Sequence, residues 1–256
     1  MRESAQLVCR AHAEVAKHIK PGVTTAKLDS VAEEFIEKNN ATASFKGYGP
    51  KNNPFPHTLC ISVNEQVVHG FPGSYQLQPG DLVSIDCGIY KNGYHGDVAY
   101  TYVVEDCTEE YMDLLRTSMQ SLYDGIDQAV HGNKIGDISN AVQSRCENKG
   151  YGVVRDLVGH GLGRSLHESP SVPNYGRKGR GERLRSGMTL AIEPMISYGY
   201  YQVDTLDDGW TVVTADGSPA AHYEHDVVVR EGEAEILSTF EYIEEITQIT
   251  IDKVTA

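Results

Sequence analysis

Two aspartates stand in segments that are otherwise apolar and strand-like. The stretch SIDCGIYKNGYHGDVAY, residues 84–100, carries Asp86 in its first arm and Asp97 in its second. Asn92-Gly93 between two alternating runs predicts a two-residue hairpin turn, which pairs Gly88 with Asp97 and puts both carboxylates on one face of the sheet. Carboxylates held that close repel each other unless they share a proton or hold a cation, whereas on a solvated face or in a turn cap they need neither.

Three further ionisable side chains stand at apolar or glycine-rich positions. His160 lies in GHGLGRSLHESP, where the glycines argue against a helix and for a backbone that turns closely around something. Taken alone, it would be interpreted as a hydrogen-bonded structural histidine. Glu193 and Glu224 stand within segments that we expect to be apolar strands, where an unpaired charge is costly. Four carboxylates and one imidazole suit two divalent cations a few ångströms apart.

The elements that must position these residues occur in a plan that is used twice. Apolar periodicity predicts helices over residues 3–19, within 23–40, over 108–130 and around 138–146. The second pair of helices follows the first by about 110 residues, and strands follow each pair. We therefore expect one α+β domain over residues 1–256, with related halves at about 1–107 and 108–256 and a site between them.

Composition excludes several classes of protein. The chain has 256 residues, 40% of them hydrophobic, which is enough for a large core, and its net charge of −14 argues against a main role in gripping nucleic acid. Five scattered cysteines without a C-x-x-C pair favour reduced thiols in a cytosolic compartment. No apolar run approaches the ~20 residues that a membrane span requires. The one compositional shift is the basic loop NYGRKGRGERLRSG, residues 174–187, by default a solvated surface loop.

The order of the motifs resembles that of a known family. Type I methionine aminopeptidases, in the short bacterial form of these M24-type metallopeptidases, carry motifs similar to CISVNEQVVHGFPG, SIDCGIYKNGYHGD, GHGLGRSLHESP, IEPM, DGWTVVT and YEHDVVV, which cover nearly the whole chain. The resemblance implies the pseudo-two-fold pita-bread fold, an antiparallel sheet covered by helices. It also implies metal-dependent removal of the N-terminal methionine from nascent proteins and peptides, with a preference for a small second residue.

The resemblance further implies a role for each matching residue. Two divalent ions, Mn, Fe, Co or Zn, would be held by Asp86, Asp97, His160, Glu193 and Glu224. Asp97 and Glu224 would bridge the ions, and Glu193 would also shuttle a proton. His69 and His167 would contact the substrate and the tetrahedral centre as further catalytic residues. The methionine pocket would be lined by Phe55, Cys60, Leu166 and Trp210.

The same resemblance guides our expectations about partners and differences. We expect a cytoplasmic monomer that acts on nascent polypeptide N-termini, with loop 174–187 in contact with ribosomal RNA. The segment YGPKNNPFPHT is longer at residues 49–54 than its counterpart in short bacterial members, and it borders the proposed methionine pocket. Leu166 stands where an aromatic residue is common, and Val68 where Cys is frequent. Side-chain preference is therefore where this chain is expected to differ.

Other functions remain as alternatives. Proline-specific aminopeptidases and prolidases share the fold but usually carry a sizeable extra N-terminal domain, which we do not expect here. Type II members insert a helical segment between the histidine and first glutamate motifs, and only 33 positions separate His160 from Glu193. A non-catalytic binding protein of this fold would lose ligands, and all five are present. A thiol hydrolase built on Cys87 and His95 conflicts with the alternation that turns Cys87 away from Asp86.

Overall fold

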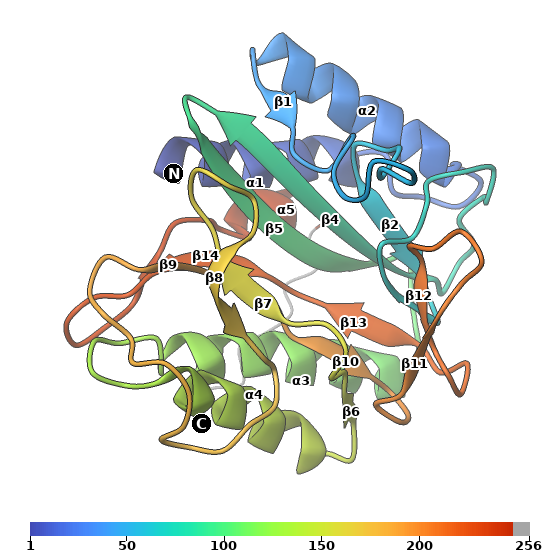
Figure 1. Ribbon diagram of the computed structural model, residues 1–256. Helices are drawn as coiled ribbons and strands as arrows, with labels where there is room; N and C mark the ends of the chain where they lie inside the picture. Colours follow the sequence, from blue (N-terminus) through green and yellow to red (C-terminus); the bar gives the residue numbers. More distant parts are fainter. Residues whose placement is uncertain (248–256) are drawn as a thin grey trace.

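Helices and antiparallel strands follow one another in two rounds (Figure 1). The computed structural model describes residues 1–247. The first round contains α1 (Arg2–Ala16), α2 (Thr25–Lys38), β1 (Thr42–Ala43), β2 (Cys60–Val63), β3 (Gln66–Val68), β4 (Leu82–Lys91) and β5 (Tyr94–Val103). The second contains α3 (Glu109–Ile126), α4 (Ile135–Glu147), β6 (Gly152–Val153), β7 (Gly159–Gly161), β8 (Glu168–Val172), β9 (Thr189–Ile192), β10 (Met195–Ser197), β11 (Val203–Thr205), β12 (Val212–Thr214), β13 (Ala220–His222), β14 (His225–Val228), β15 (Glu235–Ile236) and α5 (Glu241–Thr247). The α+β class is confirmed.

The four long helices form where apolar periodicity predicted them. Thr24 caps α2 by accepting a hydrogen bond from the backbone N of Lys27 at 3.2 Å, and Thr108 caps α3 in the same way. Their apolar faces join one large core with the inner faces of the strands. Figure 1 shows α1 and α2 on one side of the strands and α3 and α4 on the other. The division into related halves at about residue 107 stays a prediction.

A hairpin of two long strands carries the first two carboxylates. β4 and β5 pair with Gly88 opposite Asp97 and with Asp86 opposite Ala99, which is the predicted register. Asn92 and Gly93 have φ angles of 52° and 88°, as a type I′ turn requires. β1 and β2 pair with β4, so the hairpin belongs to a four-stranded sheet. The side chains of the two aspartates therefore share one face of this sheet.

The two glutamates stand where strands pass from one sheet to another. β9 and β14 pair in the five-stranded sheet β15-β14-β9-β7-β8, and β10 and β13 pair in the three-stranded sheet β13-β10-β6. A two-residue break at Glu193-Pro194 separates β9 from β10, and another at Tyr223-Glu224 separates β13 from β14. The expectation that both glutamates lie inside strands is therefore wrong, because Pro194 has no N–H to continue a ladder and the chain changes sheet there. The backbone N of Glu224 instead donates to the carbonyl of Ala99, at 2.9 Å.

One buried hydroxyl ties β13 to the hairpin. Thr101 Oγ1 donates to the carbonyl of His222 at 2.9 Å and accepts from the His222 backbone N at 2.8 Å. It also lies 2.9 Å from Ser84 Oγ, and all three residues are buried. This network fixes the segment that leads into Glu224 against the two strands that carry the aspartates.

Replacing Thr101 with valine keeps the shape of the side chain and removes its hydroxyl. We expect Thr101→Val to lower the free energy of unfolding by about 1–3 kcal/mol, because the buried N–H and C=O of His222 lose their partner. Urea denaturation of the metal-free protein measures the change. Thr205→Val, on the exposed end of β11, is the matched control. Equal losses in the two variants would contradict this role of Thr101.

Candidate metal centre and the cavity around it

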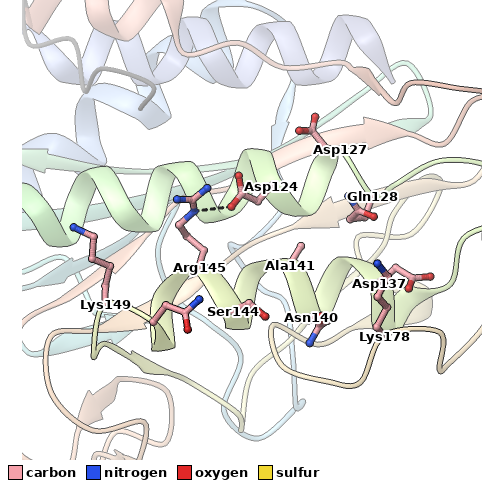
Figure 2. Close-up of a pocket in the computed structure, with 11 residues that line it drawn as sticks. Asp124, Asp127, Gln128, Asp137, Asn140, Ala141, Ser144, Arg145, Lys149 and Lys178 are labelled. Carbon is pink, nitrogen blue, oxygen red and sulfur yellow. Dashed lines mark hydrogen bonds and ion pairs between the residues drawn. The ribbon is translucent and has the colours of Figure 1, made fainter. Parts of the chain in front are cut away.

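One cavity of about 180 Å³ contains every site residue predicted from the sequence. It is lined by Phe45, Tyr48, Phe55, Cys60, His69, Asp86, Asp97, His160, Leu166, His167, Glu193, Trp210 and Glu224. The lining divides into a polar group of four carboxylates and three imidazoles and a mainly apolar group. A larger groove of about 660 Å³ between α3 and α4 contains none of the predicted site residues (Figure 2).

The carboxylates converge closely enough to share a cation. Asp97, His160 and Glu224 offer ligand atoms that all lie within 4.8 Å of one another, and all three residues are buried. Asp86 and Asp97 share one face of the hairpin, opposite Ala99 and Gly88, and Glu193 Oε1 lies 3.6 Å from His160 Nε2. Asp86 Oδ1, Asp97 Oδ1 and Glu224 Oε1 are buried and have no hydrogen-bond partner in residues 1–247. Such oxygens are costly unless a cation holds them, so this donor set fits a divalent metal.

Burial raises the pKa of all four carboxyl groups, and repulsion by neighbouring carboxylates adds to the effect for Asp86, Asp97 and Glu224. The charge of Asp86 is the second cause for Asp97, and the charge of Asp97 is the second cause for Glu224. Burial is the largest cause for Asp86 and for Glu193 as well. Without a metal, the cluster therefore retains protons near neutral pH. A divalent cation has to displace these protons when it binds.

The imidazoles are neutral near pH 7. Burial lowers the pKa of both His69 and His160 to about 4, and it also lowers the pKa of His167. His160 Nδ1 lies 2.9 Å from the carbonyl of Gly161, which can only accept, so Nδ1 carries the hydrogen and Nε2 is free to ligate. His69 has a φ of 59°, a strained conformation of the kind that clusters at functional sites.

Two side chains at this centre escaped the sequence reasoning. His222 Nε2 lies 3.4 Å from Glu193 Oε2, and the imidazole is 1% exposed. Asp226 Oδ2 accepts a hydrogen bond from the backbone N of Asp97 at 2.9 Å. Both residues are two positions from Glu224, and this period-2 spacing of ionisable residues in HYEHD is the signal that could have found them. His222 is suited to orient Glu193, and Asp226 to fix the backbone of Asp97.

The apolar lining forms a small core of its own. Phe55, Cys60 and Leu166 are buried in one cluster with Phe45, and Trp210 packs against it. Cys60 lies opposite Asp86 in the pairing of β2 with β4, so the apolar group directly adjoins the carboxylates. Phe45 and Tyr48 were not among the predicted residues. The cavity can therefore hold an apolar side chain next to a polar, metal-binding group.

The alternative of a thiol hydrolase is wrong. Cys87 packs into the main core, on the face of β4 away from the cavity. Burial raises the pKa of its thiol well above the usual value, so no thiolate forms near neutral pH. His95, the expected base, instead lies 2.9 Å from Ser44 Oγ through its Nδ1.

Comparison with known proteins decides the family. The model of metallopeptidase family M24 matches residues 1–231. The chain belongs to this family. The methionine aminopeptidase of Clostridium perfringens is 52% identical over 93% of this chain and 94% of its own length. The crystal structure of the methionine aminopeptidase from Thermotoga maritima matches with a TM-score of 0.90 and 43% identity, covering 93% of this chain and 95% of that one. The resemblance noted in the motifs and the pita-bread fold of the M24 family are confirmed.

Proline-specific members of the fold are more distant. The Xaa-Pro dipeptidase from Bacillus anthracis matches with a TM-score of 0.73 and 21% identity, and the match covers 93% of this chain but 59% of that chain. A likeness at that identity shows the shared fold alone. Within residues 1–247, no helix is long and apolar enough to cross a membrane.

The raised carboxyl pKa values predict how stability depends on pH and metal. The carboxyl groups bind protons more tightly in the folded chain than in the unfolded chain, where they ionise at about pH 4. The metal-free protein should therefore lose stability as pH rises from about 7 to 8.5. This window lies above the ordinary pKa of histidine, so the lowered histidine pKa values contribute little to the change in stability. The measurement is the melting temperature in the presence of a chelator.

Addition of Mn²⁺ at about pH 8 should restore the lost stability, because the cation takes the place of the protons that the carboxyl groups have released. Asp97→Asn, which removes one charge from the cluster, should show a weaker dependence on pH and a smaller rise with Mn²⁺. A metal-free protein whose melting temperature is flat over this window and unmoved by Mn²⁺ would contradict the proposed cluster.

Proposed function

We propose that the chain removes the N-terminal methionine from nascent proteins and peptides, with a preference for a small second residue. The observation that carries this proposal is that a buried acidic cluster and an apolar lining share one cavity. Relatives named methionine aminopeptidase, one of them 52% identical, support the same activity. The partner is then the N-terminus of a nascent polypeptide, met by a monomer in the cytoplasm.

The proposed metal site holds two divalent ions, either Mn, Fe, Co or Zn. Its ligands are Asp86, Asp97, His160, Glu193 and Glu224. Four carboxylates exceed what one ion would use, and the orphaned oxygens of Asp86, Asp97 and Glu224 suit cations. Of these residues, Asp97 and Glu224 would be the ones shared by the two ions. Bound divalent ions supply Lewis-acid activation of a water molecule and of the scissile carbonyl.

The chain's own groups move protons and hold the substrate. Glu193 accepts the proton of the attacking water and passes it to the leaving amine, and His222 Nε2 lies 3.4 Å from its second oxygen. His69 and His167, neutral because burial lowers their pKa values, donate hydrogen bonds to the peptide group and to the developing oxyanion. The free α-amino group of the substrate faces the acidic cluster, which limits cleavage to the first residue.

The apolar lining receives the first side chain. Phe55, Cys60, Leu166 and Trp210 form the proposed methionine pocket. A thioether makes favourable contacts with ring edges, and the rings of Phe55 and Trp210 lie 5.3 Å apart in an edge-on arrangement. Methionine therefore suits this lining better than a polar side chain of similar length.

The test of the function is release of free methionine from Met-Ala-Ser by metal-stripped protein titrated with Mn, Co and Fe. We expect metal-dependent release that Asp97→Ala lowers by at least about a hundredfold, because an acidic ligand is lost. Met-Lys-Ser should be cleaved much more slowly. Cleavage of an Xaa-Pro peptide with silence on Met-Ala-Ser would assign the chain to the proline-specific branch. Silence on both with metal bound would favour a binding protein.

The basic loop 174–187 is the part of the surface that we assign to the ribosome. Its cations Arg177, Lys178, Arg180, Arg183 and Arg185 are all exposed. The loop is held along the start of α4, because Ile135 N donates to Glu182 O and Leu184 N donates to Asn133 O. The neighbouring groove in Figure 2 is lined by Lys178 of this loop together with Asp124 and Asp137, whose charges make the groove itself a poorer site for a polyanion. The cations of the loop therefore carry the proposed contact with ribosomal RNA.

Charge reversal tests this contact. We expect the change of Arg177, Lys178, Arg180 and Arg183 to Glu to abolish co-sedimentation with ribosomes at low salt, because contact with phosphates depends on these cations. The matched control reverses the exposed Lys17, Lys20, Lys27 and Lys38 on the opposite side of the molecule. Methionine release should be unchanged in both. Unaltered co-sedimentation of the loop variant would end the proposal.

A further inference from the structure

Two loops join at the rim of the cavity through the chain's single tryptophan. Trp210 Nε1 donates to the carbonyl of Asn53 at 3.0 Å, and Asn53 Nδ2 donates to the carbonyl of Asp208 at 3.0 Å. These bonds connect the segment between β1 and β2 with the loop between β11 and β12. We call the joint, made by Gly49, Asn53, Asp208 and Trp210, the loop clasp.

Gly49 lets the indole come this close. Its φ is 98°, and a Cβ built on it would lie 2.5 Å from Cη2 and 2.6 Å from Cζ2 of Trp210. The ring therefore packs directly against the Gly49 backbone, where no other residue fits without displacing it. Asp208 Oδ1 fixes the other side by accepting from the backbone N of Trp210 and of Thr211, both at 2.8 Å.

The loop clasp holds two rings of the cavity wall. Trp210 meets Phe55 at 5.3 Å and His69 at 5.9 Å between ring centroids, both edge-on. Tyr48, next to Gly49 in the chain, lies 5.0 Å from the ring of His167. Phe55 N donates to Tyr48 O at 2.8 Å and closes the segment on itself. The wall around the first substrate side chain thus depends on contact between the two loops.

We propose that the loop clasp determines specificity for the first substrate side chain by holding Trp210 as a fixed wall of the methionine pocket. This inference rests on the proposed function above. Residues 49–54 are also where we expect this chain to be longer than short bacterial members of the family, which would make this wall a feature of the chain itself. Release of Trp210 would widen the pocket and remove contacts with methionine. The acidic cluster would be left intact, because β4, β5 and β7 carry Asp86, Asp97 and His160, while β9 and β14 flank Glu193 and Glu224, and none of these strands belongs to the clasp.

Two glycines in one segment provide a matched pair of variants. Gly49→Ala adds a methyl group that collides with Trp210, whereas Gly47→Ala adds one that meets nothing within 4 Å. Both positions have positive φ, 98° and 87°, so the two variants carry similar backbone strain. Only the first disrupts the loop clasp. Circular dichroism shows whether each variant is folded.

The measurements are kinetics and fluorescence. We expect Gly49→Ala to raise KM for Met-Ala-Ser roughly tenfold and to narrow the preference for Met-Ala-Ser over Leu-Ala-Ser, because contacts with the first side chain are lost. Acrylamide quenching should rise as well, and since Trp210 is the only tryptophan, this signal reports the loop clasp directly. Gly47→Ala should change neither KM nor acrylamide quenching by more than about twofold.

Asn53 is exposed, and Asn53→Ala removes only its side-chain hydrogen bond to the carbonyl of Asp208. This variant replaces Gly49→Ala in the test if Gly49→Ala fails to fold. It should move KM and quenching in the same direction by a smaller amount. Identical behaviour of the Gly49→Ala and Gly47→Ala variants would overturn the inference, and so would increased quenching with an unchanged KM. Inactivity of the unaltered protein on Met-Ala-Ser would instead refute the proposed function. Acrylamide quenching does not depend on activity, so it would still report whether the loop clasp is intact.

Discussion

Repulsion among four buried carboxylates is the constraint on which the rest of the structure depends. Burial raises the pKa of each, and the charge of a neighbour opposes the ionisation of the next. Such groups separate unless the backbone that carries them is fixed. Here Asp86 and Asp97 stand on a hairpin with a continuous ladder, and the backbone of Glu224 is bonded to Ala99, which lies opposite Asp86 and two positions after Asp97. The fold acts as a frame that keeps these acids together and ready for a cation.

The same strands build both the frame and the site. In β4, Ile85 and Cys87 are buried in the main core, while Asp86 between them faces the cavity. In β5, Val98 faces the core and Asp97 faces the cavity. Because side chains alternate along a strand, the apolar residues that hold the hairpin against α1 also fix where the carboxylates point. Stability and metal binding are therefore coupled residue by residue.

The sequence predicted what local chemistry determines. Asn92-Gly93 sets the turn, the turn sets the register, and the register brings the aspartates together. Helix positions followed from apolar spacing. Pro194 was a signal for the break at Glu193, whereas the break at Glu224 had none, because a short apolar run looks the same whether it stays in one sheet or passes between two. The contact of Gly49 with Trp210 escaped because the two residues lie more than a hundred positions apart in the chain.

The two parts of the cavity are held by different kinds of interaction. Strand pairing and buried hydroxyls position the acidic cluster, and these contacts extend through the core. The apolar wall relies on loops joined by one glycine contact and two hydrogen bonds at the surface. A change in the wall costs little folding free energy, because Gly49 and Asn53 are exposed, whereas a change beneath the carboxylates disturbs the core. Substrate preference in such a structure can therefore vary in the loops while the metal-binding frame stays the same.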